Sequence, residues 1–411
     1  MNAIAKSRAM WMVVALLVPV ALLNYLDRQM LATMKTSVMG DILDIGNDAN
    51  WGRMLGQFKW VYAFLSPVGG YIADRFGRRM TICGSLLAWS LVTWATGHVT
   101  TYEGLLVTRS LMGISEAFYI PAALALIADY HPARTRSSAV GVHQMAIYLG
   151  VIVGGFGGFV AEHPQLGWRL AFNACGLIGV IYSVPLFLLL RDRRGTDGSR
   201  AAAGGVLESV RELLSNGSFI LLVLYFTLPA LAGWVVRDWM PAIFQDQFHL
   251  TQGRAGVWAT LPWQLAAIVG AGVGGWLADR WMDQTQRGRI YVSAIGMALI
   301  IPGIFGVGNA GTLTMAIALL SLFGIGWGFF DSNNMPLLAQ ITRPGLRATG
   351  YGIMNLVSIS CGGLADWGFG VLRDQRVPLN RIFGIFAAIA LVSLVIVLLI
   401  RPRPETLESV D

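Results

Sequence analysis

The sequence predicts an all-α membrane protein with twelve transmembrane helices, arranged as two pseudo-symmetric six-helix bundles. Of its 411 residues, 55% are hydrophobic and only 13% are charged, whereas a soluble domain carries about 25% charged residues. Apolar runs of about 20 residues, long enough to cross the hydrocarbon core as helices, alternate with short clusters rich in Arg, Asp, Gly and Pro. The runs lack the period-2 alternation of a transmembrane barrel, so a barrel is excluded.

The predicted spans follow these apolar runs in chain order. They cover residues 10–38, 53–73, 80–98, 104–128, 136–160, 168–190, 218–243, 255–278, 289–308, 312–338, 346–371 and 379–400. Residues 1–190 then form the N-terminal bundle, 191–217 a cytoplasmic linker, and 218–411 the C-terminal bundle. The linker is rich in Gly, Ala and Ser, and we expect a short surface helix around Val206–Leu214 within it. The first run does not resemble a cleaved signal peptide, so we expect it to be retained as a span.

The positive charges predict the orientation. With this set of spans, nearly all Arg and Lys clusters fall on one side of the membrane. The exception is the last loop on the opposite side, which contains Arg373, Arg376 and Arg381. The positive-inside rule therefore puts both termini in the cytoplasm of a multi-pass protein of the cell inner (plasma) membrane. Most of the residues that produce the net charge of +7 thus lie between the spans and set the membrane orientation, so we expect no nucleic-acid partner. All three cysteines fall within apolar runs, which argues against a disulfide framework or a metal site.

The two halves of the chain share an internal repeat. The sequence GGYIADR at 69–75 follows the second span, and GGWLADR at 274–280 follows the eighth. A second pair agrees, because RSSAVG at 136–141 opens the fifth span and RATGYG at 347–352 opens the eleventh. Two matches in register with the spans indicate a duplicated half.

The element at 70–79 resembles the cytoplasmic loop signature of the major facilitator superfamily. The resemblance implies the major facilitator fold, in which two bundles hold substrate near the membrane midplane and alternate between inward-open and outward-open states. Asp74 is expected to cap a neighbouring helix and to pair with a cytoplasmic Arg in one state only. The alternative is that these charges merely anchor the loop at the interface. The signature residues expected to take part in gating are Gly70, Asp74, Arg75, Gly77 and Arg78, with Asp279 and Arg280 in the second copy.

A narrower resemblance lies in the first and fourth spans. NYLDR at 24–28 and RSLMGISEA at 109–117 are similar to the organic anion–cation symporter branch, which includes sugar-acid:proton symporters, sialin and vesicular glutamate transporters. EAFYIP at 116–121, followed by IAD at 127–129, also resembles Spinster-type lipid transporters. The two branches share much of this pattern.

Four ionisable residues fall within these two spans, where such residues are rare and usually functional. Arg109 and Glu116 are seven residues apart and share a helix face, roughly 10 Å apart. We expect Glu116 to pair with Arg109, and Asp27 with a nearby Arg; the alternative is a static network that fixes helix packing. The resemblance implies that Asp27 and Glu116 are proton sites and that Arg28 and Arg109 are their partners or contact the substrate. A substrate carboxylate would draw an Arg away, and the freed carboxyl would take up a proton.

Lys59 in the second span is a further charge. It would add a third cation that favours an anionic substrate, or it would snorkel to the headgroups. Tyr62 shares its face and matches a substrate-contacting Tyr of the symporter pattern, although a plain core aromatic would look the same. Arg237 and Asp238 near the outer end of the seventh span are a candidate extracellular gate pair, where the symporter pattern is uncharged.

Polar residues in other spans complete the candidate substrate site. Asn334 in the tenth span and Asn355 in the eleventh carry amides that suit a polyhydroxylated ligand, and Asn355 matches an Asn of the sugar-acid symporters. The alternative is hydrogen bonding between helices. Gln144 and Tyr148 in the fifth span share a face and are candidates of the same kind. His143 beside them is expected to serve packing.

Together these features predict a transporter and not an enzyme. We expect proton-coupled symport of a small organic anion, such as a sugar acid or other monocarboxylate, by a monomer in the bilayer that uses no cofactor apart from the proton as coupling ion. The alternatives are a Spinster-like exporter of lipids or amphiphiles, a proton-antiport exporter, and a receptor that has kept a transporter fold. No Walker sequence is present, which excludes ATP-driven transport by this chain.

Overall fold

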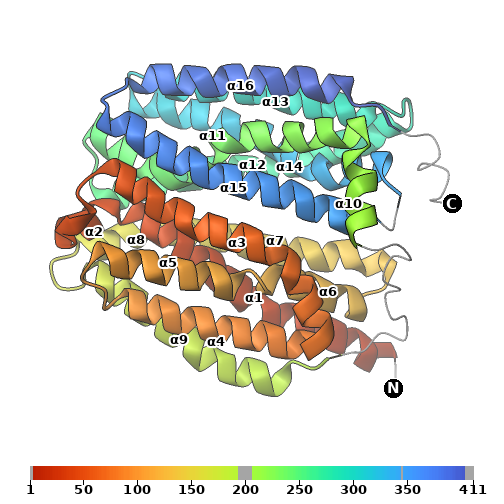
Figure 1. The fold of residues 1–411 in the computed structure, drawn as a ribbon, viewed down its shortest axis with the longest axis horizontal. Helices are drawn as coiled ribbons and strands as arrows, with labels where there is room; N and C mark the ends of the chain where they lie inside the picture. The colour runs from red at the N-terminus through yellow and green to blue at the C-terminus, as the bar shows by residue number, and fades with distance from the viewer. Residues whose placement is uncertain (1–2, 193–205, 344–345, 403–411) are drawn as a thin grey trace. The chain divides into compact units, whose positions relative to one another are not determined.

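A computed structural model describes residues 3–192, 206–343 and 346–402 of the chain (Figure 1). All regular secondary structure in these ranges is helical. The helices are α1 (Ala3–Thr33), α2 (Lys35–Asp41), η1 (Leu43–Ile45), α3 (Asp48–Phe76), α4 (Arg78–Thr96), α5 (Tyr102–Glu116), α6 (Tyr119–Tyr130), α7 (Ala133–Gly155), α8 (Gly157–Glu162), α9 (Gly167–Leu189), α10 (Val206–Leu214), α11 (Gly217–Phe248), α12 (Gln252–Met282), α13 (Gly288–Val307), α14 (Leu313–Ile341), α15 (Arg347–Asp374) and α16 (Leu379–Leu399).

Each predicted span lies on a helix or on two consecutive helices. The first span corresponds to α1 and α2, the fourth to α5 and α6, and the fifth to α7 and α8. The linker helix α10 lies where the sequence predicts it. Within the described residues, nine helical segments are long and apolar enough to cross a membrane. The chain is therefore a multi-pass, all-helical membrane protein.

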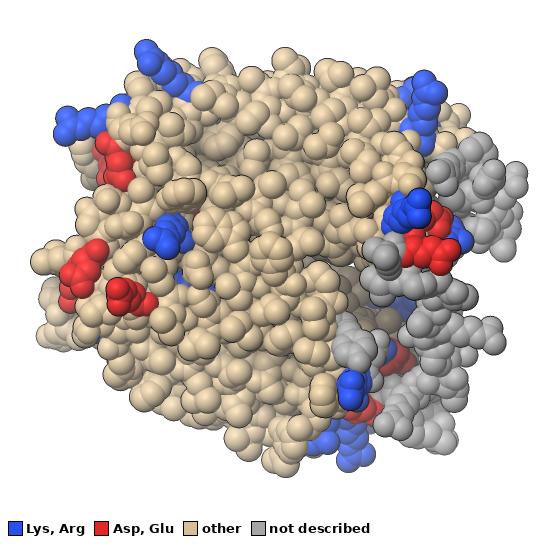
Figure 2. All heavy atoms as spheres, viewed as in Figure 1, with Lys and Arg blue, Asp and Glu red and all other residues tan. Residues whose placement is uncertain are grey.

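The outer surface of the helices suits a bilayer. Along α9, side chains recurring at helical spacing are more than half exposed although they are large and apolar: Leu177, Ile178, Ile181, Val184 and Leu188. On the face shown in Figure 2, charged side chains gather near the helix ends and the surface between them is almost uncharged. A soluble monomer rarely exposes such a continuous apolar surface, so we assign it to lipid contact.

The chain divides into two compact units. The first comprises Met1–Gly198 and Arg237–Thr260, and the second comprises Ser199–Val236 and Leu261–Asp411. The C-terminal end of α11 and the N-terminal end of α12 therefore belong with the N-terminal helices. In the first unit α1 packs on α7, α4 on α9 and α3 on α5; in the second, α13 packs on α14 and α16.

The packing of α3 on α5 brings the backbones of the two helices very close together. A Cβ added at Gly113 of α5 would lie 2.8 Å from the backbone oxygen of Phe58 in α3, closer than any real Cβ contact. Glycine at this position thus lets the helices approach as small residues do in membrane interfaces. The approach sets Phe58 and Tyr62 of α3 beside the charged residues of α1 and α5.

Candidate functional site

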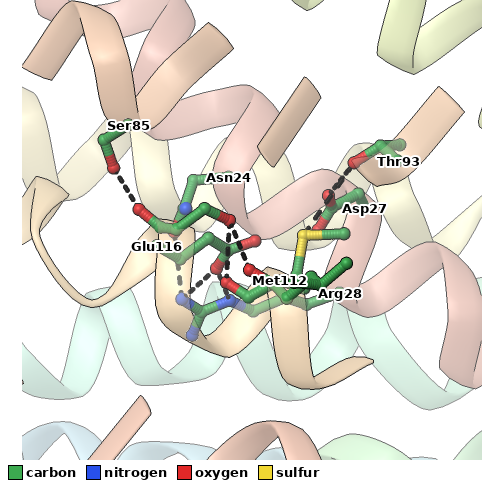
Figure 3. Close-up of polar contacts among 9 residues, drawn as sticks. Asn24, Asp27, Arg28, Ser85, Thr93, Met112 and Glu116 are labelled. Atoms are coloured by element: carbon green, nitrogen blue, oxygen red, sulfur yellow. Dashed lines mark hydrogen bonds and ion pairs between the residues drawn. The ribbon is translucent and has the colours of Figure 1, made fainter. Parts of the chain in front are cut away.

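A buried ion pair joins α1 to α5. The Arg28 Nε donates a hydrogen bond of 2.7 Å to Glu116 Oε2, and Arg28 Nη2 is a second contact of the same carboxylate. Nη2 also donates to Asn24 Oδ1 at 3.3 Å, one turn earlier on α1. Figure 3 shows Arg28 reaching from α1 toward Glu116, which is completely buried. This is the charge-assisted geometry that makes hydrogen bonds strong.

Three aromatic rings surround the Arg28 guanidinium. Its central carbon lies 4.8 Å from the ring centroid of Tyr25, 4.5 Å from that of Phe58 and 5.0 Å from that of Tyr62. Each ring face attracts the cation. Tyr62 thus lies against Arg28, whereas the sequence places it on the face of Lys59. The rings and the carboxylate together hold this guanidinium in one position.

Asp27 points away from Arg28 toward α4. Thr93 Oγ1 donates a hydrogen bond of 2.8 Å to Asp27 Oδ2, and Asp27 is 2% exposed. Its Oδ1 accepts no hydrogen bond from the described residues. The charges of Arg109 and Arg28 also act on Asp27, so the expected Arg lies nearby, while Thr93 supplies the hydrogen bond. Sequence reasoning missed Thr93, because it is one of five hydroxyl residues within the third apolar run and nothing in the sequence distinguishes it from the others.

Arg109 is the second buried guanidinium of this cluster. It is 2% exposed, and its Nε and Nη2 have no hydrogen-bond acceptor among the described residues. The charges of Asp27 and Glu116 both act on it, yet it forms no ion pair with either in the described structure. The expected pairing of Glu116 with Arg109 is therefore wrong, because the side chain of Arg28 reaches Glu116 from the neighbouring helix.

The fourth span is kinked at this point. Helix α5 ends at Glu116 and α6 begins at Tyr119. Pro121 lies in the first turn of α6, where its missing N–H costs nothing. A Cβ added at Gly69 would lie 2.9 Å from the backbone oxygen of Ala117, so a small residue is needed beside the kink. Ala117 and Phe118 keep helical dihedral angles, so α5 and α6 form one membrane span that is kinked directly after the carboxylate.

Lys59 forms a separate ion pair within the first unit. Its Nζ contacts Asp238 Oδ2 of α11, and the two residues are 3% and 8% exposed. Because Lys59 is buried, it does not snorkel to the headgroups. We expected its positive charge to attract an anionic substrate, but Asp238 neutralises that charge in this structure. The Arg237 guanidinium lies 5.4 Å from the Tyr25 ring centroid, and a gating role of Arg237 and Asp238 stays a prediction.

The other polar candidates occupy both units. In the first, Gln144 and Tyr148 of α7 are half-buried, and His143 packs as expected, with Nε2 2.8 Å from the Tyr119 hydroxyl. In the second, Asn355 of α15 is half-buried. Asn334 of α14 is 2% exposed, and both atoms of its amide lack a hydrogen-bond partner among the described residues. An amide can both donate hydrogen bonds to a hydroxyl and accept one from it.

The loop signature forms its own contacts around α4. Gly77 has a φ of +91°, a conformation that glycine adopts readily, and it separates α3 from α4. Arg78 pairs with Asp129 of α6. The backbone N–H of Arg79 donates a hydrogen bond of 2.8 Å to Asp192 Oδ1, so Asp192 caps α4.

The remaining signature residues are less constrained by the described contacts. Arg75 and Arg280 are exposed. In the second copy, Arg289 Nη2 donates 2.8 Å to Asp279 Oδ1. The surroundings of Gly70 and the side chain of Asp74 lie outside the described part of the structure, so the expectation for Asp74 stays a prediction.

Known proteins share this sequence pattern. Residues 17–365 match the model of the Major Facilitator Superfamily. Protein spinster homolog 1 of Bos taurus is 34% identical over 242 residues, which are 56% of this chain and 45% of that protein. Protein spinster of Drosophila melanogaster is 25% identical over 371 residues, which are 86% of this chain and 60% of that protein. The chain thus spans only about half the length of these spinster relatives. A D-galactonate transporter of Escherichia coli is 26% identical over 305 residues, 68% of this chain and 69% of that protein.

Solved structures share the fold. A bacterial homologue of the human lysosomal transporter Spinster, in an inward-facing and occupied conformation, has a TM-score of 0.81 at 19% identity, covering 97% of this chain and 98% of that one. A D-xylose-proton symporter has a TM-score of 0.77 at 16% identity, with the same coverage. These likenesses concern the fold alone.

Proposed function

The chain belongs to the Major Facilitator Superfamily, so it is a membrane transporter and not an enzyme, and we propose that it imports a small organic anion together with protons. The proposed substrate is a sugar acid or a similar monocarboxylate. We further propose the complete topology of the superfamily: twelve spans in two six-helix bundles (1–190 and 218–411) joined by a cytoplasmic linker (191–217). In this proposal both termini are cytoplasmic and the chain is a monomer in the plasma membrane.

The buried cluster of two carboxylates and two guanidiniums carries this proposal. Asp27, Arg28, Arg109 and Glu116 lie on adjacent helices of one unit and their formal charges cancel. A monoanion that binds Arg28 or Arg109 adds an uncompensated negative charge in a medium where such a charge is costly. One proton on Asp27 or Glu116 restores the balance. This electrostatic argument favours one proton for each monoanion.

The relatives support the substrate class. One matched protein is named a D-galactonate transporter, and galactonate is a polyhydroxylated monocarboxylate. Arg28 and Arg109 suit its carboxylate, and the amides of Gln144, Asn334 and Asn355 suit its hydroxyls. Tyr62 and Tyr148 are proposed contacts of the same substrate.

Uptake by the purified protein in liposomes tests the proposal. With an inward proton gradient, radiolabelled D-galactonate should accumulate, and Asp27→Asn or Glu116→Gln should abolish the accumulation while sparing counterflow exchange. Glu103→Gln is the matched control, because Glu103 is an exposed carboxylate in the first turn of the same helix as Glu116. Gradient-driven accumulation that persists in both variants would refute proton coupling through this cluster.

A second candidate function is export of a lipid-like amphiphile, or another form of proton antiport. The likeness to spinster proteins, which reaches 34% identity over part of the chain, supports it. Thermal stabilisation of the purified protein by hexuronates, aldonates, sialic acid, lactate and lysolipids separates the candidates. Stabilisation by lysolipids alone would favour the exporter.

A further inference from the structure

We propose that the Lys59–Asp238 ion pair is a lock, that is, a contact that stabilises the closed state of the transporter and breaks when the transporter opens. We call the closed state with this contact the locked state. Lys59 is an anion-binding site, which Asp238 occupies in the locked state. The inference rests on the proposed function, because it assigns Lys59 to the substrate's carboxylate during entry. Asp238 acts as a tethered carboxylate that stands in for the substrate.

The pair lies deep within the first unit. Lys59 is eleven residues beyond Asp48, where α3 begins, and Asp238 is ten residues before Phe248, where α11 ends. At 1.5 Å per residue both lie about 15 Å from these helix ends. Both side chains are buried. A pair at this depth is shielded from water and salt, unlike an ion pair at the surface.

Neutral contacts around the pair join the same segments. Gln29 Nε2 of α1 donates to the backbone oxygen of Arg237 at 3.2 Å and to Thr260 Oγ1 at 3.4 Å. Gln252 Nε2 donates to Ser37 Oγ at 2.7 Å. The segment Arg237–Thr260 is thereby bonded to the N-terminal helices, although the flanking parts of α11 and α12 belong to the second unit.

In this arrangement the ion pair is the contact that opposes separation of the Arg237–Thr260 segment from the N-terminal helices. Alternating access requires that this segment, carried by α11 and α12, separate from the N-terminal helices in one state of the cycle. The neutral hydrogen bonds can be exchanged for bonds to water at little net cost. Separation of Lys59 from Asp238 leaves two charges, each of which needs a new partner.

A substrate carboxylate supplies the partner for Lys59. It has the charge and the acceptor atoms of Asp238, so exchange of one for the other conserves the local charge. Asp238 moves with α11 toward the opening, where water can solvate it. The anion therefore favours the open state, because it binds the Lys59 ammonium, which is paired with Asp238 in the locked state.

Disulfide formation between the two cysteines of a Thr36→Cys/Gln245→Cys variant reports the locked state. Thr36 Oγ1 donates to Gln245 Oε1 at 2.7 Å on the exposed side of these contacts, and the native cysteines are first replaced by Ser. In liposomes without substrate, Asp238→Asn and Lys59→Met should each slow cross-linking about tenfold or more, since each leaves one buried charge without its partner in the locked state. The neutral double variant should be slowed less than either single variant. The exchanged variant, Lys59→Asp with Asp238→Lys, should restore the rate.

The control for the lock is Glu103→Gln. Glu103 is an exposed carboxylate in the first turn of α5, on another helix than either cross-linking position, so its loss should leave the rate unchanged. Cross-linking at the wild-type rate in both single variants, or no recovery of the rate in the exchanged variant, would overturn the lock, whatever the outcome of the uptake experiment.

The anion site is tested with sodium D-galactonate, D-galacturonate and lactate, and with neutral D-galactonamide. An anion should slow cross-linking in the otherwise wild-type protein, and galactonamide should not. In the neutral double variant the effect of the anion should be about tenfold smaller, because only the Arg28 and Arg109 cluster remains to bind it. An equal effect in both proteins, or no effect of any of the three anions, would overturn the assignment of Lys59.

Discussion

Removing Glu116 alone should destabilise the protein more than removing it together with Arg28. Glu116→Gln leaves Arg28 with no carboxylate partner, and loss of one member of a buried pair costs about 3–5 kcal/mol. The lower end applies here, because the Arg28 side chain is 16% exposed and keeps Asn24 and three aromatic rings. We therefore expect the free energy of unfolding to fall by about 3 kcal/mol.

The double variant Arg28→Met/Glu116→Gln should lose less. It removes one positive and one negative charge, so the remaining formal charges of the cluster, on Asp27 and Arg109, still cancel. Replacing both partners of a buried pair by uncharged residues is often nearly neutral. Arg28→Met alone should cost about as much as Glu116→Gln, which predicts a coupling energy of at least about 2 kcal/mol.

Denaturant-induced unfolding in detergent micelles, followed by tryptophan fluorescence and circular dichroism, measures these differences. Glu212→Gln serves as the control, because the pair of Glu212 with Arg343 is exposed on both sides and should contribute no more than about 1 kcal/mol. If the losses of the two single variants at Arg28 and Glu116 add within about 0.5 kcal/mol in the double variant, the pair does not act as a unit and the argument from charge balance fails.

Three further variants test single contacts. Thr93→Val removes a hydrogen bond to the Asp27 carboxylate and should cost about 2 kcal/mol of unfolding free energy; an unchanged value would show that the bond is not formed. Gly113→Val places side-chain atoms against the backbone of Phe58 and should cost about 1–3 kcal/mol and reduce galactonate uptake, and wild-type uptake would show that α3 can move without consequence. Asp192→Ala removes the cap of α4 and should cost about 1 kcal/mol while leaving counterflow unchanged; lost counterflow would assign Asp192 a role beyond capping.

The sequence predicts the positions of the helices because lipid imposes a simple requirement on them. An apolar run must bond its own backbone, so each run becomes a helix. Even the linker helix α10 follows its pattern, with Leu213 buried and Glu208 exposed. Charged residues within such runs stand out for the same reason, and this is how Asp27 and Glu116 are found.

The partners of those charges could not be predicted in this way. Spacing along one helix places Glu116 above Arg109, but the choice of Arg28 depends on how α1 is turned toward α5 and on the kink after Glu116. The pairing of Lys59 with Asp238 joins residues 179 positions apart. No periodicity within one helix contains such a contact, because it arises only when the helices pack.

The aromatic rings around Arg28 bear on the choice between an anion importer and an amphiphile exporter. A cluster of rings next to a transport site suggests a surface for an acyl chain. Here Tyr25, Phe58 and Tyr62 are already engaged with the Arg28 guanidinium, at about 0.5–2 kcal/mol for each ring. A lipid chain that packed on these rings would have to displace the guanidinium from them. The guanidinium would then stay buried beside Glu116 without its aromatic contacts. A carboxylate that binds in the plane of the guanidinium leaves the three rings in contact with it. The arrangement of the rings therefore favours an anionic substrate over a lipid.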